Sequence, residues 1–169
     1  MTIRTATLED VKDIAAIHVK SWQVVYQGLI PQSYLNNLSI SKREKSWQNI
    51  LTNSQTHTIL QEIDDLVVGF ANFGQTRDRD KDSKITGEIT SIYLNPEYGR
   101  KGLGTELVEF ISKNMKNRKF TQITLWVLDT NKIARKFYEK MGFKPDGATK
   151  IDIRENFELR EIRYLINLI

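Results

Sequence analysis

Two glycines near the middle of the chain lie where the backbone could bind an anion. The stretch Ile85–Leu94 is rich in β-branched and aromatic residues, which favours a strand, and Asn95-Pro96 ends it. Gly102 and Gly104 follow, at the start of an amphipathic helical pattern. The first turn of a helix has backbone N–H groups without internal partners and the positive end of the helix dipole, and glycines let a large anion approach them. This order of elements predicts an anion-binding site.

The spacing of these glycines excludes two common phosphate-binding loops. A Walker loop requires Lys after its second glycine, but Thr105 follows Gly104 here. A dinucleotide-binding loop requires a third glycine, where this chain has Leu107. The structural alternative is a plain strand-to-helix turn in which Arg100 and Lys101 are solvated.

Two segments of the chain resemble a known family. Residues 96–105 are similar to motif A of the GNAT superfamily of N-acetyltransferases, (Q/R)-x-x-G-x-(G/A), although Gly99 stands where Gln or Arg is usual. Asn131–Phe143 (NKIARKFYEKMGF) is similar to the family's N-x-x-A-x-x-F-Y-x-x-x-G-F segment. With the order of predicted elements, these segments identify the chain as a member. The resemblance implies one domain over residues 1–169, with an α/β fold whose mixed, mostly antiparallel sheet is flanked by helices.

The resemblance also implies that acetyl-CoA is the co-substrate. In the family the loop amides hold the pyrophosphate, and a bulge in the preceding strand opens a slot where backbone groups pair with the pantetheine amides. The corresponding residues are Arg100, Lys101, Gly102, Leu103, Gly104 and Thr105 in the loop, Ile92, Tyr93 and Leu94 in the strand, and Asn131, Ala134 and Tyr138 in the next helix. The nearby cations either meet the adenosine phosphate or form a solvated helix face: Lys132, Arg135 and Lys136.

Acetyl transfer to an amine needs a base for the amine proton, stabilisation of the carbonyl oxygen and a proton donor for the leaving thiolate. Direct attack by the amine requires no protein nucleophile, and the chain has no Cys. The resemblance makes Glu88 the candidate base and Tyr138 the candidate acid. Each has a structural alternative: Glu88 faces solvent or pairs with a cation, and Tyr138 packs in the core.

Aromatic residues after the first predicted helix are candidates for binding the acceptor. Trp22 and Tyr26 lie one helical turn apart, so both rings can face the same side. We expect the acceptor pocket between Trp22–Tyr26, Glu88 and a hairpin at Lys150–Phe157, with few cations nearby. The alternative is that both rings serve only packing. His18, on the same helix, is likewise either a packing residue or a catalytic one.

Two classes of function fit these residues. The first is an N-acetyltransferase that transfers the acetyl group of acetyl-CoA to a primary amine of a small molecule, peptide or protein by direct attack. The second is a non-catalytic acyl-CoA-binding regulatory module. Glu88 and Tyr138 together favour the enzyme. Asp152 and Glu155 could attract a cationic amine or simply belong to an exposed hairpin tip.

The composition limits the class of protein. The 169 residues are 40% hydrophobic and 27% charged, which is typical of globular proteins. No apolar run approaches the ~20 residues of a membrane span and no signal peptide begins the chain, so we expect a cytoplasmic protein that binds no membrane. The absence of Cys argues against a disulfide framework or zinc cluster, and no metal site is expected. The net charge is +4, and the sequence has no clustered basic face, so we expect no nucleic-acid partner. We expect the protein to be a monomer or a homodimer.

The first half of the chain is expected to contain helices and a hairpin that precede the glycine-rich loop. Two capping boxes, Thr7-x-x-Asp10 and Ser41-x-x-Glu44, predict helix starts after a first strand at Met1–Thr7. A hairpin turned at Asp64-Asp65 joins predicted strands at Thr56–Glu62 and Leu66–Phe73. Alternating charges in Gln75–Ser83 predict a solvated loop.

The second half is expected to carry the cofactor elements. A helix over residues 102–116 makes a parallel crossover from Ile85–Leu94 to Thr121–Leu128. A helix opened by Asn131 has Ile133, Phe137, Tyr138 and Met141 at helical spacing. A strand starts at Phe143, with a turn at Pro145-Asp146-Gly147, and an antiparallel pair closes the chain: Lys150–Ile153 and Glu158–Ile169.

Overall fold

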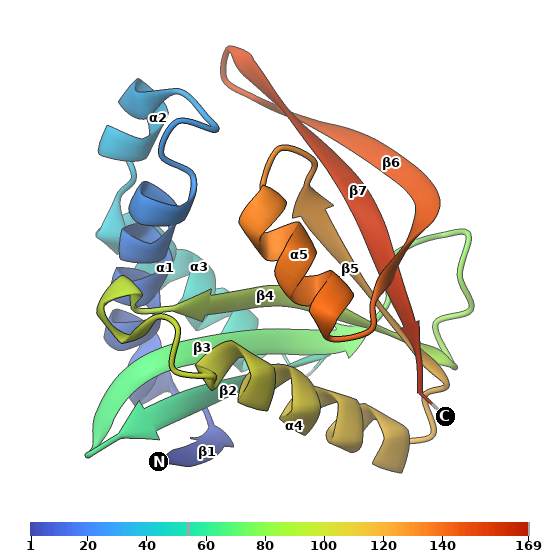
Figure 1. Ribbon diagram of the computed structural model, residues 1–169. Coiled ribbons are helices and arrows are strands. Elements are labelled where there is room, and N and C mark those ends of the chain that lie inside the picture. Colours follow the sequence, from blue (N-terminus) through green and yellow to red (C-terminus); the bar gives the residue numbers. More distant parts are fainter. Residues whose placement is uncertain (54, 169) are drawn as a thin grey trace.

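The computed structural model describes residues 1–53 and 55–168 and has one seven-stranded sheet in the order β1-β2-β3-β4-β5-β7-β6 (Figure 1). Residue 169, the expected end of the last strand, lies outside the described residues. The strands are β1 (Thr2–Thr5), β2 (Thr56–Ile63), β3 (Leu66–Gln75), β4 (Thr86–Leu94), β5 (Gln122–Leu128), β6 (Lys144–Arg154) and β7 (Phe157–Asn167). The helices are α1 (Val11–Val25), α2 (Gln32–Asn36), α3 (Ile40–Thr52), α4 (Leu103–Asn117) and α5 (Lys132–Lys140), with short 3-10 helices η1 (Leu8–Asp10) and η2 (Pro96–Tyr98).

The sheet is antiparallel except at its centre, where β4 and β5 pair in parallel and helix α4 makes the crossover between them. This confirms the mixed, mostly antiparallel sheet and the single parallel crossover. Helices α1 and α3 cover one face of the sheet, and α4 and α5 cover the other (Figure 1).

Alternation along the strands sends side chains to these two layers. On β2, Leu60 packs with α1 and Trp47 of α3, whereas its neighbour Ile59 packs with the α4 side. The α4 stripe of Leu107, Ile111 and other buried residues covers that second face. The sheet therefore separates two hydrophobic cores.

Three local predictions were wrong. The third helix begins at Ile40, not after Ser41, because Ser39 is the N-cap and its hydroxyl accepts a hydrogen bond from the Lys42 amide at 3.3 Å. Ile133 was grouped with Phe137 and Tyr138 by its helical spacing, but it is 84% exposed because it lies on the outer side of α5. Pro145-Asp146-Gly147 is an irregularity inside β6, where the pairing with β7 shifts register, and not a turn between two strands.

The charged loop between β3 and β4 is also not simply solvated as predicted. Arg163 of β7 is only 3% exposed and holds this loop by two carboxylates, with Nη2 2.6 Å from Asp80 and Nη1 3.1 Å from Asp78. Its Nε atom donates to Asp146 of the β6 irregularity at 2.8 Å. One buried guanidinium thus fixes two irregular segments beside the sheet.

Removing this guanidinium should destabilise the fold. We expect Arg163→Met to lower the free energy of unfolding by about 3 kcal/mol, because Asp78 and Asp146 would keep their charges but lose the buried guanidinium that they share. Urea denaturation would measure the change, with the exposed Arg160→Met on the same strand as control. Equal stability of both variants would contradict the prediction.

The stabilisation should also depend on pH. The hydrogen bond from Arg163 lowers the pKa of Asp80 from 3.8 to about 2. Because the folded value lies below the unfolded one, this contribution is present above pH about 4 and is lost as the pH falls towards 2.

Candidate active site

The centre of the sheet opens between β4 and β5. The two strands pair from Thr86 with Gln122 as far as Ile89 with Leu125, and beyond that point their described residues form no further pairs. A bulge lies at this place, because the β3–β4 register shifts opposite Thr90. The hydroxyl of Thr90 donates to the carbonyl oxygen of Asn72 at 3.1 Å. The backbone edge of β4 is consequently free over its last residues on the side of β5.

The loop at the end of this strand is shaped to present backbone N–H groups. Arg100 and Gly102 both have positive φ, 64° and 80°. Gly102 is the N-cap of the fifteen-residue helix α4 and offers no side-chain cap, so the first amides of the helix point out of its end. Alternation of right- and left-handed residues forms concave anion sites of this kind.

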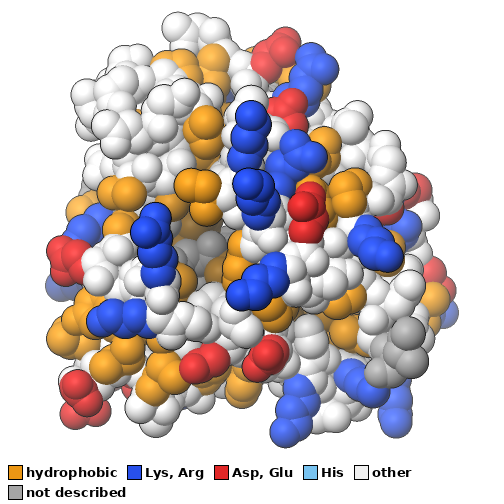
Figure 2. Space-filling view, in the orientation of Figure 1, with side chains coloured by type: hydrophobic (Ala, Val, Ile, Leu, Met, Phe, Trp, Pro, Cys, Tyr) orange, Lys and Arg blue, Asp and Glu red, His pale blue; other side chains and the backbone are white. Residues whose placement is uncertain are grey.

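Gly104 brings the start of α4 close to α5. A Cβ atom at this position would lie 3.2 Å from Cζ of Phe137, so a larger residue would displace that ring. Lys and Arg side chains lie near the loop before α4 and over α5, on either side of a hollow (Figure 2). The open amides, the missing side chain and the cations suit a large phosphorylated ligand.

The N-terminus of α5 is fixed by Asn131, whose Oδ1 accepts a hydrogen bond from the Ala134 amide at 3.1 Å. Arg135 is bound within the protein, because its Nε donates to the Tyr164 hydroxyl at 3.1 Å and its Nη1 to the Asp129 carbonyl at 2.9 Å. Lys132 and Lys136 remain exposed. Of the three cations considered for the adenosine phosphate, these two are therefore the exposed ones.

Tyr138 lies on the inner side of α5 and is half-buried, with its ring 5.2 Å from Phe137 and 5.9 Å from Phe143. Burial, with a smaller effect of neighbouring Tyr93, raises the pKa of the Tyr138 phenol well above its ordinary value. The phenol therefore stays protonated at neutral pH. It does not line the cavity described next but adjoins it through Tyr93.

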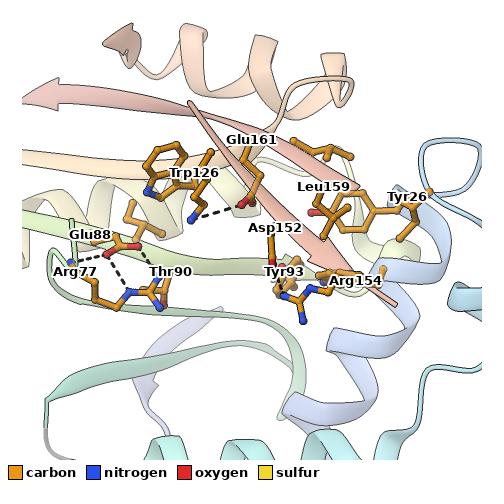
Figure 3. A pocket seen from close by; sticks show the side chains of 15 residues that line it. Tyr26, Arg77, Glu88, Thr90, Tyr93, Trp126, Asp152, Arg154, Leu159 and Glu161 are labelled. Carbon is orange, nitrogen blue, oxygen red and sulfur yellow. Dashed lines mark hydrogen bonds and ion pairs between the residues drawn. The ribbon is translucent and has the colours of Figure 1, made fainter. Parts of the chain in front are cut away.

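A cavity of about 290 Å³ lies beside the β4 bulge and is lined in part by Glu88 and Thr90 of that strand (Figure 3). Residues of α1, β4, β5 and the β6–β7 hairpin line it, among them Trp22, Tyr26, Glu88, Thr90, Tyr93, Trp126, Lys150, Asp152, Arg154 and Glu161. The predicted walls, Trp22–Tyr26, Glu88 and the closing hairpin, are thus brought together. Phe157 packs on Tyr34 of α2, with ring centroids 5.0 Å apart, and this contact holds the tip of the β6–β7 hairpin against α2.

Glu88 is 1% exposed, and its carboxylate is held by Arg77 from the β3–β4 loop. Nη2 of Arg77 lies 2.6 Å from Oε1, and Nε and the backbone amide lie 3.2 and 2.9 Å from Oε2. The structure therefore shows a cation partner for Glu88 and also places it in the cavity wall. The Arg77 side chain is 69% exposed, so this cation is not part of the packed core.

The cavity is richer in cations than the sequence predicted. Arg77, Lys150 and Arg154 line it, each opposite a carboxylate. Sequence reasoning missed Trp126 and Glu161 as cavity residues. The period-2 alternation of β5 and β7 could have indicated their common face, but the pairing of these strands could not be read locally.

Aromatic residues at the C-terminal end of α1 form another wall of the cavity. Trp22 and Tyr26 pack edge to face with centroids 4.7 Å apart. His18 lies behind them, stacked 4.8 Å from Tyr93, and its Nδ1 accepts a hydrogen bond from Trp47 at 3.0 Å. Burial lowers the pKa of His18 to about 3. His18 is consequently a neutral packing residue, which was the first of the two interpretations of its sequence position.

A family model and the sequences of individual proteins both identify this chain with acetyltransferases. Residues 22–143 match the model of the Acetyltransferase (GNAT) family. An uncharacterized N-acetyltransferase, YuaI of Bacillus subtilis (strain 168), is 32% identical over 96% of this chain and 88% of its own length. A spermidine N(1)-acetyltransferase of Thermoplasma acidophilum is 26% identical over 89% of this chain and 92% of its own length.

A solved structure has the same fold. The PaiA N-acetyltransferase of Thermoplasma acidophilum, in complex with coenzyme A, superposes with a TM-score of 0.74 at 22% identity, covering 96% of this chain and 98% of the other. Within the described residues of the present chain, no helix is both long and apolar enough to cross a membrane.

Proposed function

Because the chain belongs to the GNAT family of acetyltransferases, which use acetyl-CoA, we propose that it acetylates a small primary amine by direct attack within the 290 Å³ cavity. One observation carries the proposal: β4 serves both sites. Its free edge leads to the anion-binding loop, and its side chains Glu88, Thr90 and Tyr93 line the cavity. An amine in the cavity would therefore meet a donor bound along the strand.

The chain offers a continuous set of contacts to this donor. When bound, acetyl-CoA supplies a thioester whose acetyl group is transferred. The first amides of α4, from Gly102 to Thr105, bind its pyrophosphate, and the backbone of Ile92–Leu94 pairs with its pantetheine arm. Asn131 uses Oδ1 as a helix cap, so its Nδ2 is the atom left for that arm.

Tyr138 donates a hydrogen bond to the sulfur as negative charge develops there. Its raised pKa lies above that of an ordinary thiol near 8.5, so complete proton transfer to the thiolate is uphill. A hydrogen bond that strengthens in the transition state lowers the barrier without this transfer.

Glu88 accepts the proton of the amine, directly or through one water. The carboxylate already receives three hydrogen bonds from Arg77, so the exposed Arg77 head must loosen as the amine approaches. Exchange of one cation for another at the same carboxylate keeps its charge compensated. This reconciles the ion pair with a catalytic role.

Glu88→Gln tests this role. We expect kcat/KM for the acceptor to fall about 10²-fold and its pH profile to lose the limb that belongs to the base, because the amide cannot accept the proton. The exposed Glu158→Gln should behave as the unaltered protein. An unchanged pH profile in Glu88→Gln would remove Glu88 from the mechanism.

The proposal as a whole is tested by thiol release from acetyl-CoA with a panel of amines, with the acetylated product identified by mass spectrometry. The spermidine acetyltransferase among the relatives and the small cavity both favour small amines over folded proteins. Binding of CoA without thiol release from any amine would instead favour a non-catalytic module.

A further inference from the structure

The cavity contains three carboxylates, each with its own cation. Arg77 contacts Glu88 at 2.6 Å, and Arg154 contacts Asp152 at 2.8 Å. The third pair is Lys150 and Glu161, whose charged atoms are 3.5 Å apart. The last distance exceeds the usual range of a charge-assisted hydrogen bond, 2.7–2.9 Å. The ion pair of Lys150 is therefore the longest of the three.

Lys150 is also the cation with an aromatic partner in the cavity. Its Nζ lies 4.3 Å from the centroid of the Trp126 ring, within the distance at which an ammonium is attracted to an indole face. Trp126 itself is fixed, because its Nε1 donates to both carboxylate oxygens of Asp78, at 3.1 and 3.3 Å. A rigid indole face and the Glu161 carboxylate thus form a binding site for a primary ammonium group, occupied by the chain's own lysine.

This ammonium site belongs to the same cavity as the proposed base. Trp126 and Glu161 lie on one side of the cavity and Glu88 on the other (Figure 3). Trp126 directly follows Leu125, the last residue of β5 that pairs with β4. The site is therefore next to the place where the two strands separate.

We propose that the acceptor carries two amino groups: one is acetylated near Glu88, and the second, as an ammonium, displaces Lys150 from Trp126 and Glu161. The inference rests on the proposed function and specifies its substrate class as a diamine or longer polyamine. Lys150 can withdraw because its stem is flexible and its side chain is 41% exposed. With the site filled by substrate, the charge of Glu161 stays compensated.

Three matched series of probes test the inference: linear monoamines, α,ω-diamines and ω-amino acids of equal chain length. We expect diamines to have a KM about tenfold below that of monoamines, and amino acids to be the poorest acceptors. A preference for amino acids would overturn the inference, because Lys150 would then be recognising a carboxylate.

Two variants locate the effect. Lys150→Met should lower KM for diamines several-fold and leave monoamines nearly unchanged, because it removes the competing ammonium. Glu161→Gln should raise KM for diamines about tenfold, and in that background Lys150→Met should have little further effect. Lys144→Met, exposed on the same strand, is the matched control.

The outcomes separate this inference from the proposed function. If monoamines and diamines are acetylated with equal KM and Lys150→Met changes neither, the second ammonium site is wrong although the enzyme is active. If no amine releases thiol, the proposed function fails first. A rise of KM for every amine in Lys150→Met would also contradict the displacement of this lysine.

Discussion

Tyr138→Phe is expected to lower kcat about 10²-fold while the fold and the affinity for CoA stay the same. The ring contacts with Phe137 and Phe143 need no hydroxyl, so Phe preserves the packing of α5. Only the donor to the developing thiolate is lost. Initial rates of thiol release at saturating acetyl-CoA and acceptor would measure the change in kcat.

A control separates this role from simple packing. Tyr34→Phe removes a hydroxyl from α2, where the ring packs on Phe157, and should retain full activity. If Tyr138 only packs in the core, Phe would serve equally well there too. Full kcat in Tyr138→Phe would therefore exclude it as the donor.

Gly104→Asp should weaken CoA binding by at least about 10²-fold, because a carboxylate would face the pyrophosphate across the open amides of α4. The new Cβ would also press on Phe137, 3.2 Å away. An acidic residue in the first turn favours the helix itself through its dipole, so a weaker helix would not explain the loss. Calorimetric titration with CoA measures the affinity directly.

Gly104→Ala distinguishes the two causes of that loss. It introduces the same contact with Phe137 without the charge, and a smaller loss of affinity than in the Asp variant is expected. Thermal unfolding should show that both variants remain folded. Unaltered CoA affinity in Gly104→Asp would contradict the placement of the pyrophosphate at this helix.

The sequence was most informative where the signal is local. Three local signals each determine the conformation of the segment around them: the β-branched run before Pro96, the glycines at 102 and 104, and the Asn131 cap. Strand β4 and helices α4 and α5 were therefore predicted close to their observed bounds. The parallel crossover followed because a strand, a helix and a strand of these lengths have few other arrangements. These elements and their crossover were therefore predictable from the residues, whereas the complete fold was implied by the family resemblance.

The ion pairs of the β3–β4 loop and the contacts of Lys150 were not predictable in this way. The alternating charges of residues 75–83 indicated a solvated loop, whereas Arg163, 83 positions after Asp80, binds it to the sheet. Lys150 and Trp126 meet only because β7 lies between β5 and β6. Ion pairs between strands that are distant in sequence depend on strand order, which side-chain patterns do not encode.

Direct attack by an amine on a donor held along β4 is the central claim, and initial rates at varied concentrations of both acetyl-CoA and a diamine test it most directly. Direct attack requires both substrates on the protein together, so double-reciprocal plots should give intersecting lines, with one acetylated amine formed for each thiol released. Parallel lines, with an acetylated protein isolated in the absence of amine, would show a covalent intermediate and contradict the account.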